Sequence, residues 1–358
     1  MNILFITQVY PNKNNPGIAI FLKQLVDSFK NNGNNIKVLK PTNTRNFKNQ
    51  TLEYEETYCT KFLSLGDKYF RHFTLISFIF SSILFLFNIK KKPDFIYGKF
   101  LYFSGGACFF IKKFFGIPYF IDIGESNIFY YKNKLDIFLM RKFLSYADGI
   151  ICVSEKLKTQ IMSCNVDESK VLLAKNTVDN SKFKVLNPSY ARKVLGLNND
   201  DFIIVFVGHF NYRKGPDRLL KAVETGNFPK HVKIVFLGTG DIDLESDRIL
   251  FKGEVATENL IFWLNASNLF ALPTIAEGNS NAINEALSLG IPIICSNIKE
   301  LHEQIPAEYA TYFDPLDIKS IQIAISKNLS KSILRLTPVI FKINRNTMIA
   351  DWIAKKLT

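Results

Sequence analysis

Two glutamates separated by seven residues, Glu277 and Glu285, stand out in the segment EGNSNAINEAL. The segment follows the apolar run LFALP, which is typical of a buried strand. Carboxylate oxygens accept hydrogen bonds from the paired hydroxyls of a sugar, whereas they repel phosphates. Two carboxylates beside the end of a strand are therefore suited to binding the sugar part of a ligand.

A helix is expected to begin near Ser280 or Asn281 and to stop at Gly290. Around this helix Glu285 lies about 200° from the apolar Ile283, so we expect its side chain to point away from the core. The free backbone N–H groups of the first turn can hold an anion such as a diphosphate. Both glutamates are then expected to border the strand end rather than the core.

Two cations, Arg213 and Lys214, follow a second apolar run, FIIVFVG, which ends at Gly208. Arginine clamps phosphate oxygens with two parallel hydrogen bonds, and lysine adds a point charge. Cations at one strand end and carboxylates at another suit a ligand that is part phosphate and part sugar, which is a nucleotide sugar. An exposed basic turn remains the alternative for this loop taken alone.

Short apolar runs that alternate with longer amphipathic runs surround these residues, which is the pattern of strands alternating with helices. Near-continuous apolar strands argue for a parallel sheet that helices cover on both faces. The pattern restarts after a polar stretch, so we place a hinge near 175–185. We therefore expect an α/β fold of two doubly wound, Rossmann-like domains facing a cleft, with ligands bound beyond the carboxyl ends of the strands. The expected strands are 2–7, 36–41, 94–99, 118–124, 149–154, 202–208, 232–238, 248–253, 269–273 and 291–296.

The basic residues are unevenly distributed along the chain. Lys and Arg exceed Asp and Glu by 13, and residues 1–170 carry 23 basic and 13 acidic residues, a net charge of +10. A basic half suggests an anionic partner, such as nucleic acid, an anionic membrane surface or a phosphorylated substrate. A solvated basic surface is the alternative. We expect no nucleic acid partner, because no recognised nucleic-acid module appears.

The location of the protein is suggested by its cysteines and its N-terminus. The five cysteines form no CxxC pair, and MNILFITQVYP lacks the basic and apolar regions of a secretory signal. Free thiols are typical of a reducing compartment, so we expect a cytoplasmic protein. The apolar run 73–87 has 15 residues, fewer than the roughly 20 that a spanning helix needs. We expect a buried helix first, a helix that touches lipid on the cytoplasmic face second, and a span last.

Three segments in the second half match a known family in order and spacing. VGHFNYRKGPDRLLKA, LGTGD and LPTIAEGNSNAINEALSLGIPIICS resemble the GT4-type retaining glycosyltransferases with the GT-B fold, the glycosyl transferases group 1. The segments YPNKNNPGIAIFLKQLVDSF, IPYFIDIGES and GIICVSEKLK fit its first domain more weakly. The resemblance implies an acceptor-side domain over 1–178, a donor-binding domain over 179–338, and a helix over 339–358 that crosses back onto the first domain.

The resemblance also implies roles for the site residues. Glu277 would bind the transferred sugar and support the reacting centre, and Glu285 would bind the donor ribose. Arg213 and Lys214 would stabilise the leaving diphosphate, which makes Glu277, Arg213 and Lys214 the expected catalytic residues. The other expected donor-binding residues are Gly17, Gly208, His209, Gly253, Glu254, Val255, Gly278, Asn279, Ser280 and Asn281.

The activity that the resemblance implies is transfer of a sugar with retention of the anomeric configuration, without a cofactor or metal ion. The donor would be a UDP- or GDP-sugar and the acceptor a glycan or lipid-linked saccharide. Cell-surface polysaccharides such as capsule or O-antigen are the expected products. The possible metal-binding run DID at 241–243 follows a glycine turn, and we interpret it as a solvated loop.

Two positions depart from the family pattern. His209 stands where many relatives have an arginine, and Ile123 falls where the first domain usually offers a catalytic histidine. A catalytically impaired relative or a nucleotide-binding protein therefore stays open. An α/β hydrolase is a weaker alternative, because GNSNA lacks the second glycine of a nucleophile elbow. The acceptor-side candidates around Ile123 are Asp122, Gly124, Glu125 and Ser126.

Overall fold

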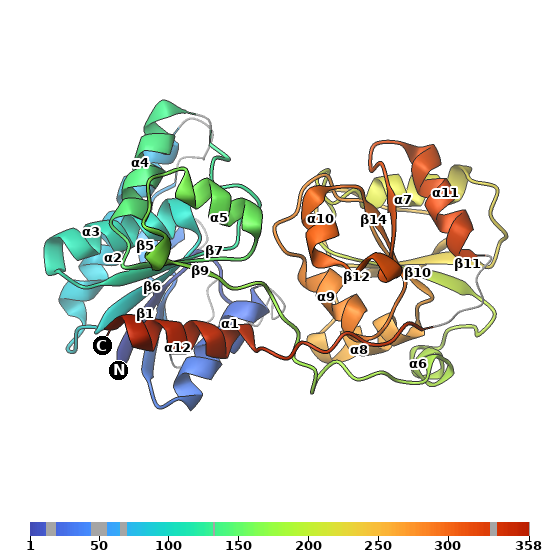
Figure 1. The fold of residues 1–358 in the computed structure, drawn as a ribbon, viewed down its shortest axis with the longest axis horizontal. Coiled ribbons are helices and arrows are strands. Elements are labelled where there is room, and N and C mark those ends of the chain that lie inside the picture. Colours follow the sequence, from blue (N-terminus) through green and yellow to red (C-terminus); the bar gives the residue numbers. More distant parts are fainter. Residues whose placement is uncertain (12–18, 44–55, 65–69, 132, 330–334, 358) are drawn as a thin grey trace. The chain divides into compact units, whose positions relative to one another are not determined.

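The computed structural model describes residues 1–11, 19–43, 56–64, 70–131, 133–329 and 335–357. The chain forms two compact units, shown in Figure 1. Unit 1 consists of Met1–Lys175 together with Arg345–Thr358, and unit 2 consists of Asn176–Asn344. Where the sequence suggested a boundary after residue 178, unit 1 ends at Lys175.

Unit 1 contains a seven-stranded parallel sheet in the order β4-β2-β1-β6-β7-β8-β9. The strand order reverses at β1. The strands that come next in sequence lie on one side of β1, and β6 with the strands after it lies on the other side. Ligands bind beyond the carboxyl ends of strands at such a reversal. The strands are β1 (Asn2–Ile6), β2 (Asn35–Leu39), β4 (Thr57–Tyr58), β6 (Phe95–Lys99), β7 (Tyr119–Ile123), β8 (Gly149–Cys152) and β9 (Val171–Leu173), and β3 (Thr42–Asn43) pairs with β5 (Lys61–Phe62) in a separate two-stranded sheet.

Helices cover both faces of this sheet, as its strands require. Alternate side chains of β1 enter two different cores, with Leu4 and Ile6 in one and Ile3 and Phe5 in the other. The first core is closed by α2 (Arg71–Asn88), α3 (Gly106–Phe115), α4 (Lys134–Ser145) and α5 (Glu155–Met162), and the second by α1 (Ile20–Asn31) and α12 (Arg345–Leu357).

The C-terminal helix α12 packs on the sheet of unit 1 beside α1 (Figure 1). Its Trp352 ring lies edge-on to Phe120 of β7, with 5.9 Å between ring centroids. Gly149 makes this approach possible, because a Cβ at that position would lie 2.5 Å from the Trp352 ring. The predicted return of the final segment to the first part of the chain matches this packing, although α12 begins at Arg345 rather than near 339.

Unit 2 contains a six-stranded parallel sheet in the order β12-β11-β10-β13-β14-β15. Strands β10, β11, β13 and β14 are almost wholly buried and are apolar except for Lys233 and Ser296, as expected for a sheet covered on both faces. The strands are β10 (Phe202–Val207), β11 (Val232–Leu237), β12 (Ile249–Gly253), β13 (Leu269–Leu272), β14 (Ile293–Ser296) and β15 (Ala310–Phe313), and the helices are α6 (Pro188–Leu195), α7 (Pro216–Thr225), α8 (Thr257–Ala266), α9 (Asn281–Ser288), α10 (Lys299–Gln304) and α11 (Ile318–Leu329).

Two features of unit 1 were not foreseen from the sequence. Residues Leu101–Gly105 form a π-helix directly after β6, and Phe100 before it has a φ of 71°, in the left-handed region. Both features are uncommon for ordinary residues and recur at functional sites. They lie at the carboxyl end of a strand that borders the chain reversal of this sheet.

Candidate active site

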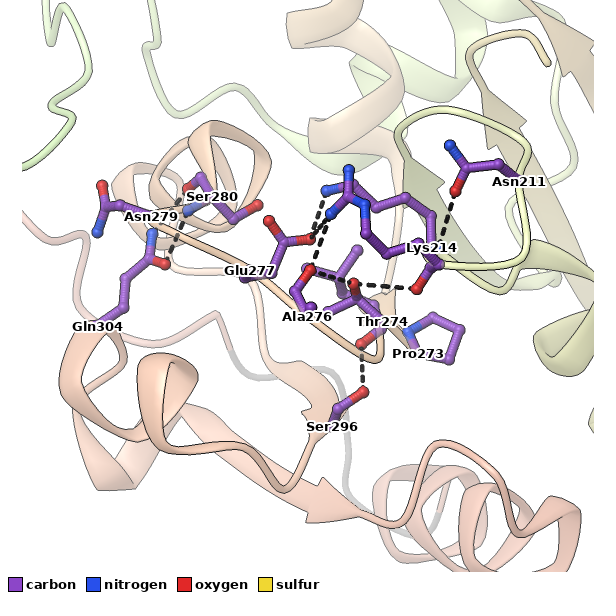
Figure 2. Close-up of polar contacts among 12 residues, drawn as sticks. Asn211, Lys214, Pro273, Thr274, Ala276, Glu277, Asn279, Ser280, Ser296 and Gln304 are labelled. Carbon is purple, nitrogen blue, oxygen red and sulfur yellow. Dashed lines mark hydrogen bonds and ion pairs between the residues drawn. The ribbon is translucent and has the colours of Figure 1, made fainter. Parts of the chain in front are cut away.

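The loops that follow β10 and β13 meet at one edge of the sheet of unit 2. The two strands run parallel with Ile204 opposite Leu269, so their carboxyl ends are adjacent. The backbone N–H of Ile275 donates to the carbonyl of Arg213 at 2.8 Å, and Thr274 Oγ1 lies 3.2 Å from the same oxygen. These bonds join the two loops and bring segments 63 residues apart into one structure (Figure 2).

Glu277 lies at the centre of this structure, against both predicted cations. Its Oε1 is 2.5 Å from Lys214 Nζ and 3.6 Å from the Arg213 guanidinium (Figure 2). We predicted that Glu277 lies outside the core, but the residue is only 6% exposed. The cations and the loop backbone cover it, and they compensate the charge that burial would otherwise penalise. Within the described residues Glu277 Oε2 has no hydrogen-bond donor, so it can accept one from a ligand hydroxyl.

Arg213 and Lys214 differ in exposure. The Arg213 guanidinium donates to the carbonyl of Ala276 at 2.8 Å, while 42% of its side chain remains exposed. The Lys214 side chain is 13% exposed and ends at Glu277. Asn211 fixes the loop before them, since its Oδ1 accepts from the backbone N–H of Lys214 at 3.0 Å. An anion at this edge would meet a fixed lysine and a guanidinium with free donors.

The turn that presents these cations depends on Gly215 and on a buried arginine that sequence reasoning missed. Gly215 has a φ of 69°, and a Cβ there would lie 2.1 Å from Arg218 Nη2 and 2.6 Å from the carbonyl of Pro273. Arg218 donates to the carbonyls of Tyr212 and Pro273 at 2.9 and 2.7 Å. It therefore fastens the loop after β10 to the end of β13. The only sign of this role in the sequence was the position of Arg218 in the first turn of the amphipathic helix α7.

Glu285 occupies the middle of α9, four residues after the start at Asn281. Its carboxylate has no hydrogen-bond or ion-pair partner within the described residues. Part of the side chain reaches solvent, yet burial raises the pKa of Glu285 to about 7. The predicted orientation away from the apolar side of the helix therefore places this carboxylate in a poorly hydrated position. A ligand that donates hydrogen bonds would stabilise its charged form.

A network of side-chain amides holds the start of α9. Asn176 donates from its backbone N–H to Asn279 Oδ1 at 2.9 Å and from Nδ2 to the Asn279 carbonyl at 2.8 Å. Asn284 Nδ2 donates in turn to the Asn176 carbonyl at 2.7 Å. Asn279 and Asn284 thus position the segment after Glu277, and Asn281 is exposed. Sequence reasoning gave Asn176 and Asn284 no role, because nothing in their spacing shows that they meet.

Gln304 changes one expectation about the helix start. It accepts from the Ser280 backbone N–H at 2.9 Å and donates to the Ser280 carbonyl at 2.7 Å (Figure 2). The prediction that the Ser280 amide is free for a ligand is therefore wrong in this conformation, since a side chain from α10 already satisfies it. Within the described residues the amides of Gly278 and Asn279 have no acceptor, so these two remain available.

The remaining donor-binding candidates of unit 2 lie at the same edge of its sheet. Gly208 directly follows β10 and its backbone N–H donates to the Leu237 carbonyl, while the Gly238 N–H donates to the Gly253 carbonyl, both at 2.9 Å. Gly238 must lack a side chain, because a Cβ there would lie 2.0 Å from the Gly208 carbonyl oxygen. His209 and Glu254 are exposed beyond these strands, and Val255 is half-buried. Gly17 lies outside the described residues.

In unit 1 the candidate Asp122 is a buried ion-pair partner. It is 1% exposed and lies 2.8 Å from Arg345 Nη2, 3.0 Å from Lys99 Nζ and 2.7 Å from the donating Tyr97 hydroxyl. Burial alone would raise the pKa of Asp122, but Arg345, Lys99 and the Tyr97 hydroxyl outweigh it and lower the pKa to about 2. This geometry favours a structural role, fastening α12 to β7, over the acceptor contact that we predicted.

Glu125 fits an acceptor-side role better. Its Oε1 accepts from the Leu101 backbone N–H at 2.7 Å, at the start of the π-helix. Its Oε2 is buried and has no hydrogen-bond donor within the described residues. Burial raises the pKa of this carboxyl, although the Leu101 amide and Lys99 act in the opposite direction. Of the neighbouring candidates, Gly124 is exposed and Ser126 is half-buried.

No group of three or more His, Cys, Asp or Glu residues that could hold a metal ion occurs in the described part of the chain.

Comparisons with known proteins agree with this architecture. The family described as Glycosyl transferases group 1 matches residues 201–331. A putative teichuronic acid biosynthesis glycosyltransferase, TuaC of Bacillus subtilis, is 26% identical over 83% of this chain and 81% of its own length. The capsular polysaccharide biosynthesis glycosyltransferase CapM of Staphylococcus aureus is 26% identical over 56% of this chain and 57% of its own length.

Solved structures show the fold. Sucrose-phosphate synthase from Thermosynechococcus elongatus superposes with a TM-score of 0.76 at 18% identity, covering 99% of this chain and 96% of that one. HepE of Anabaena, solved with UDP and glucose, gives a TM-score of 0.71 at 14% identity, covering 99% and 100%. The two doubly wound units, the site motifs and these matches agree, and we conclude that the chain is a glycosyltransferase with the GT-B fold, whose residues 201–331 match the glycosyl transferases group 1.

Proposed function

We propose that this protein is a GT4-type retaining glycosyltransferase that moves a sugar from a nucleoside diphosphate sugar to a glycan or lipid-linked saccharide. The observation that supports the proposal is the contact of Glu277 with Lys214 and Arg213, because a carboxylate suits sugar hydroxyls and the two cations beside it suit phosphates. The names of TuaC and CapM support a product that is a cell-surface polysaccharide.

The proposed chemistry follows from the charges at this edge. When the bond from the anomeric carbon to the diphosphate breaks, its electron pair goes to the diphosphate. Lys214 and Arg213 meet the negative charge that develops there, which lowers the barrier. The acceptor oxygen forms the new bond to the anomeric carbon and releases its proton to the departing phosphate oxygen.

The two glutamates orient the donor for this step. Glu277 Oε2 accepts a hydrogen bond from a hydroxyl of the transferred sugar, and the Glu285 carboxylate accepts from the ribose hydroxyls. The amides of Gly278 and Asn279 supply donors between them. Because the cations provide the charge that a divalent ion would otherwise supply, we propose that transfer needs neither a metal ion nor a cofactor.

The donor is proposed to be a UDP- or GDP-sugar. HepE was solved in complex with UDP-glucose, and a 26% identical relative from Escherichia coli is named as a UDP-Gal-dependent galactosyltransferase. A thermal-shift panel of nucleotide sugars tests this, because a ligand that binds only the folded state raises the melting temperature. We expect one nucleotide sugar to raise it in the parent and in the control variant Glu258→Gln, and to have a much smaller effect in Glu285→Gln. Equal shifts in all three would contradict the proposed site.

One observation favours a second candidate, a relative that binds nucleotide without transferring sugar. Ile123 is fully buried and offers no acid, base or hydrogen-bond donor where the family has its histidine. We propose that Glu125 supplies the polar group on this side instead. Donor binding without turnover on any saccharide would favour the non-catalytic candidate.

The proposed location is the cytoplasm, with peripheral attachment to the cytoplasmic face of the membrane. No disulfide joins any of the five cysteines, all of which lie in the described residues, and Cys108, Cys152, Cys164 and Cys295 are buried as thiols, which suits a reducing compartment. Nucleotide sugars are highly charged and do not cross a bilayer unaided, so a transferase that uses them is expected on the side where they are made.

A further inference from the structure

Helix α2 exposes a row of large apolar side chains along its outer face. Phe73, Ile76, Phe80, Leu84 and Phe87 follow one another at intervals of three and four residues, which places them on one side of the helix. They are between 43% and 70% exposed. We refer to these five residues as the apolar stripe.

Three hydroxyl-bearing side chains of the same helix face inward. Thr74, Ser81 and Ser82 are buried, although hydroxyls normally occupy the solvent side of an amphipathic helix. Their hydroxyls are satisfied inside the unit: Thr74 and Ser82 donate to carbonyls one turn earlier, and Ser81 donates to Thr60 Oγ1 at 2.7 Å. This inverted polarity suits a helix whose outer face meets an apolar environment rather than water.

The inner face fixes α2 to unit 1. Leu75 and Phe78 belong to the core beneath the sheet, and Asp136 of α4 pairs with both Arg71 and His72 at the start of the helix. The helix is long and apolar enough to cross a membrane by length and composition, but 44% of it is buried inside the protein. A helix held in this way can lie along a membrane surface, whereas spanning the bilayer would require it to leave its core.

Positive charge borders the stripe. Lys90, Lys91 and Lys92 are exposed directly after the helix, and Lys113 is exposed on the neighbouring α3. Phe114 on α3 adds a 69% exposed ring, and Phe87 contacts Phe115 with 5.2 Å between ring centroids. An apolar face with a lysine border is typical of helices that lie in the interface of an anionic bilayer.

We propose that the apolar stripe, extended by Phe114, docks unit 1 on an anionic lipid bilayer, with α2 parallel to the membrane plane and Lys90–Lys92 at the lipid phosphates. The choice of lipid as the partner rests partly on the proposed function, since a lipid-linked acceptor would lie in such a surface. A second copy of this chain is the competing occupant, and its contact would bury the stripe without any need for the lysines.

Flotation of the full chain with vesicles tests the docking. We expect the parent to float with vesicles that contain phosphatidylglycerol and to stay mostly soluble with phosphatidylcholine alone. Ile76→Ser/Phe80→Ser, and separately Lys90→Gln/Lys91→Gln/Lys92→Gln, should lower partitioning at least about tenfold. The matched controls, Leu316→Ser/Ile323→Ser and Lys221→Gln/Lys230→Gln/Lys319→Gln, change exposed residues of unit 2 and should float like the parent. Recovery of the parent in the soluble fraction with anionic vesicles would overturn the proposal.

A second readout separates the possible arrangements and does not depend on activity. Tryptophan in Phe80→Trp should be quenched by brominated acyl chains, whereas tryptophan in the control Ile323→Trp should not. Release from vesicles by alkaline carbonate is expected, and retention would show a span instead. If the parent is a dimer without vesicles and Ile76→Ser/Phe80→Ser is a monomer, the stripe is a self-association surface and the docking proposal is wrong. Donor-induced thermal shifts of the stripe variants should match the parent, so failure of the docking and failure of the proposed function are distinguishable.

Discussion

Lys214 Nζ lies 2.5 Å from Glu277 Oε1, although the two residues come from loops that follow different strands. The contact joins the carboxyl ends of β10 and β13 and buries a carboxylate at the edge where parallel sheets bind ligands. Glu277 is thereby held by cations that, in the proposed reaction, also face the leaving diphosphate.

The first prediction concerns this lysine. Lys214→Ala removes a cation that faces the leaving diphosphate in the proposed reaction, and it leaves Glu277 with one weaker partner, Arg213, at 3.6 Å. We expect the transfer rate at saturating donor to fall about 100-fold or more, the size of loss that follows removal of one electrostatic stabiliser. The exposed Lys221→Ala in α7 is the control and should keep the parent rate. A Lys214→Ala enzyme as fast as the parent would exclude this role.

The second prediction is a pH dependence of donor binding. Burial raises the pKa of Glu285 to about 7, so the carboxyl is protonated in the free enzyme below that pH. Since the proposed contact needs the ionised form, donor affinity should rise as the pH rises through about 7. Glu285→Gln should bind weakly with a flatter profile. Calorimetric titration across this range measures it, and an equally steep profile in Glu285→Gln would assign the titration to another group.

The same carboxyl affects stability with a defined sign. Its folded pKa lies above the ordinary value of 4.5, so the unfolded chain loses the proton first as the pH rises. Its effect on stability is therefore most favourable below about 4.5 and is lost as the pH rises to about 7. Urea unfolding without ligand should show that Glu285→Gln gains stability relative to the parent over this interval, and a constant difference would contradict the assignment.

The third prediction concerns the anchor of α12. Arg345→Ala leaves the buried Asp122 with Lys99 and the Tyr97 hydroxyl only, and breaking a buried ion pair costs roughly 3–5 kcal/mol. Hydrogen exchange should then accelerate in α12, whereas the exposed Asp351→Ala on the same helix should leave it unchanged. The pKa of Asp122 is lowered to about 2, so the stability that it contributes is present above about 4 and is lost as the pH falls toward 2. Unchanged exchange in Arg345→Ala would show that packing around Trp352 suffices.

The fourth prediction compares two glycines with nearly equal backbone geometry. Gly215 and Gly196 have φ angles of 69° and 67°, but a Cβ at Gly196 meets nothing within 4 Å, whereas one at Gly215 meets Arg218 and Pro273. Alanine at either position adds about 1–2 kcal/mol of backbone strain. Only Gly215→Ala should also move the loop that presents Arg213 and Lys214, and so weaken donor binding. Equal donor affinity in the two variants would contradict this account of the loop.

The sequence predicted the parts of the fold that depend on local patterns. Buried parallel strands such as β10 and β11 appear in the sequence as nearly continuous apolar runs. Gly215 and Pro216 indicated the turn and the helix start that follow β10. The sequence also predicted that Glu277 and Lys214 follow the ends of two different strands, and the structure shows that these strands are neighbours. The π-helix after Phe100 left no pattern, since its residues are ordinary apolar ones.

The contacts that complete the site could not be foreseen for a different reason. Gln304, Asn176 and Arg218 act through hydrogen bonds to backbone atoms of distant segments, and such bonds leave no periodicity in the sequence. The ion pair of Asp122 could not be foreseen because its partner Arg345 lies 223 residues away. The outward stripe of α2 was hidden as well, because apolar composition alone does not tell which side of a helix is buried.

The transfer rate of Glu277→Gln tests the central claim most directly. The substitution keeps the shape of the side chain but removes the charge that Lys214 and Arg213 contact. We expect turnover to fall about 100-fold or more while donor binding through the Glu285 side of the site survives. A variant that transfers sugar at the parent rate, with the parent's donor affinity, would show that Glu277 is not at the reacting centre.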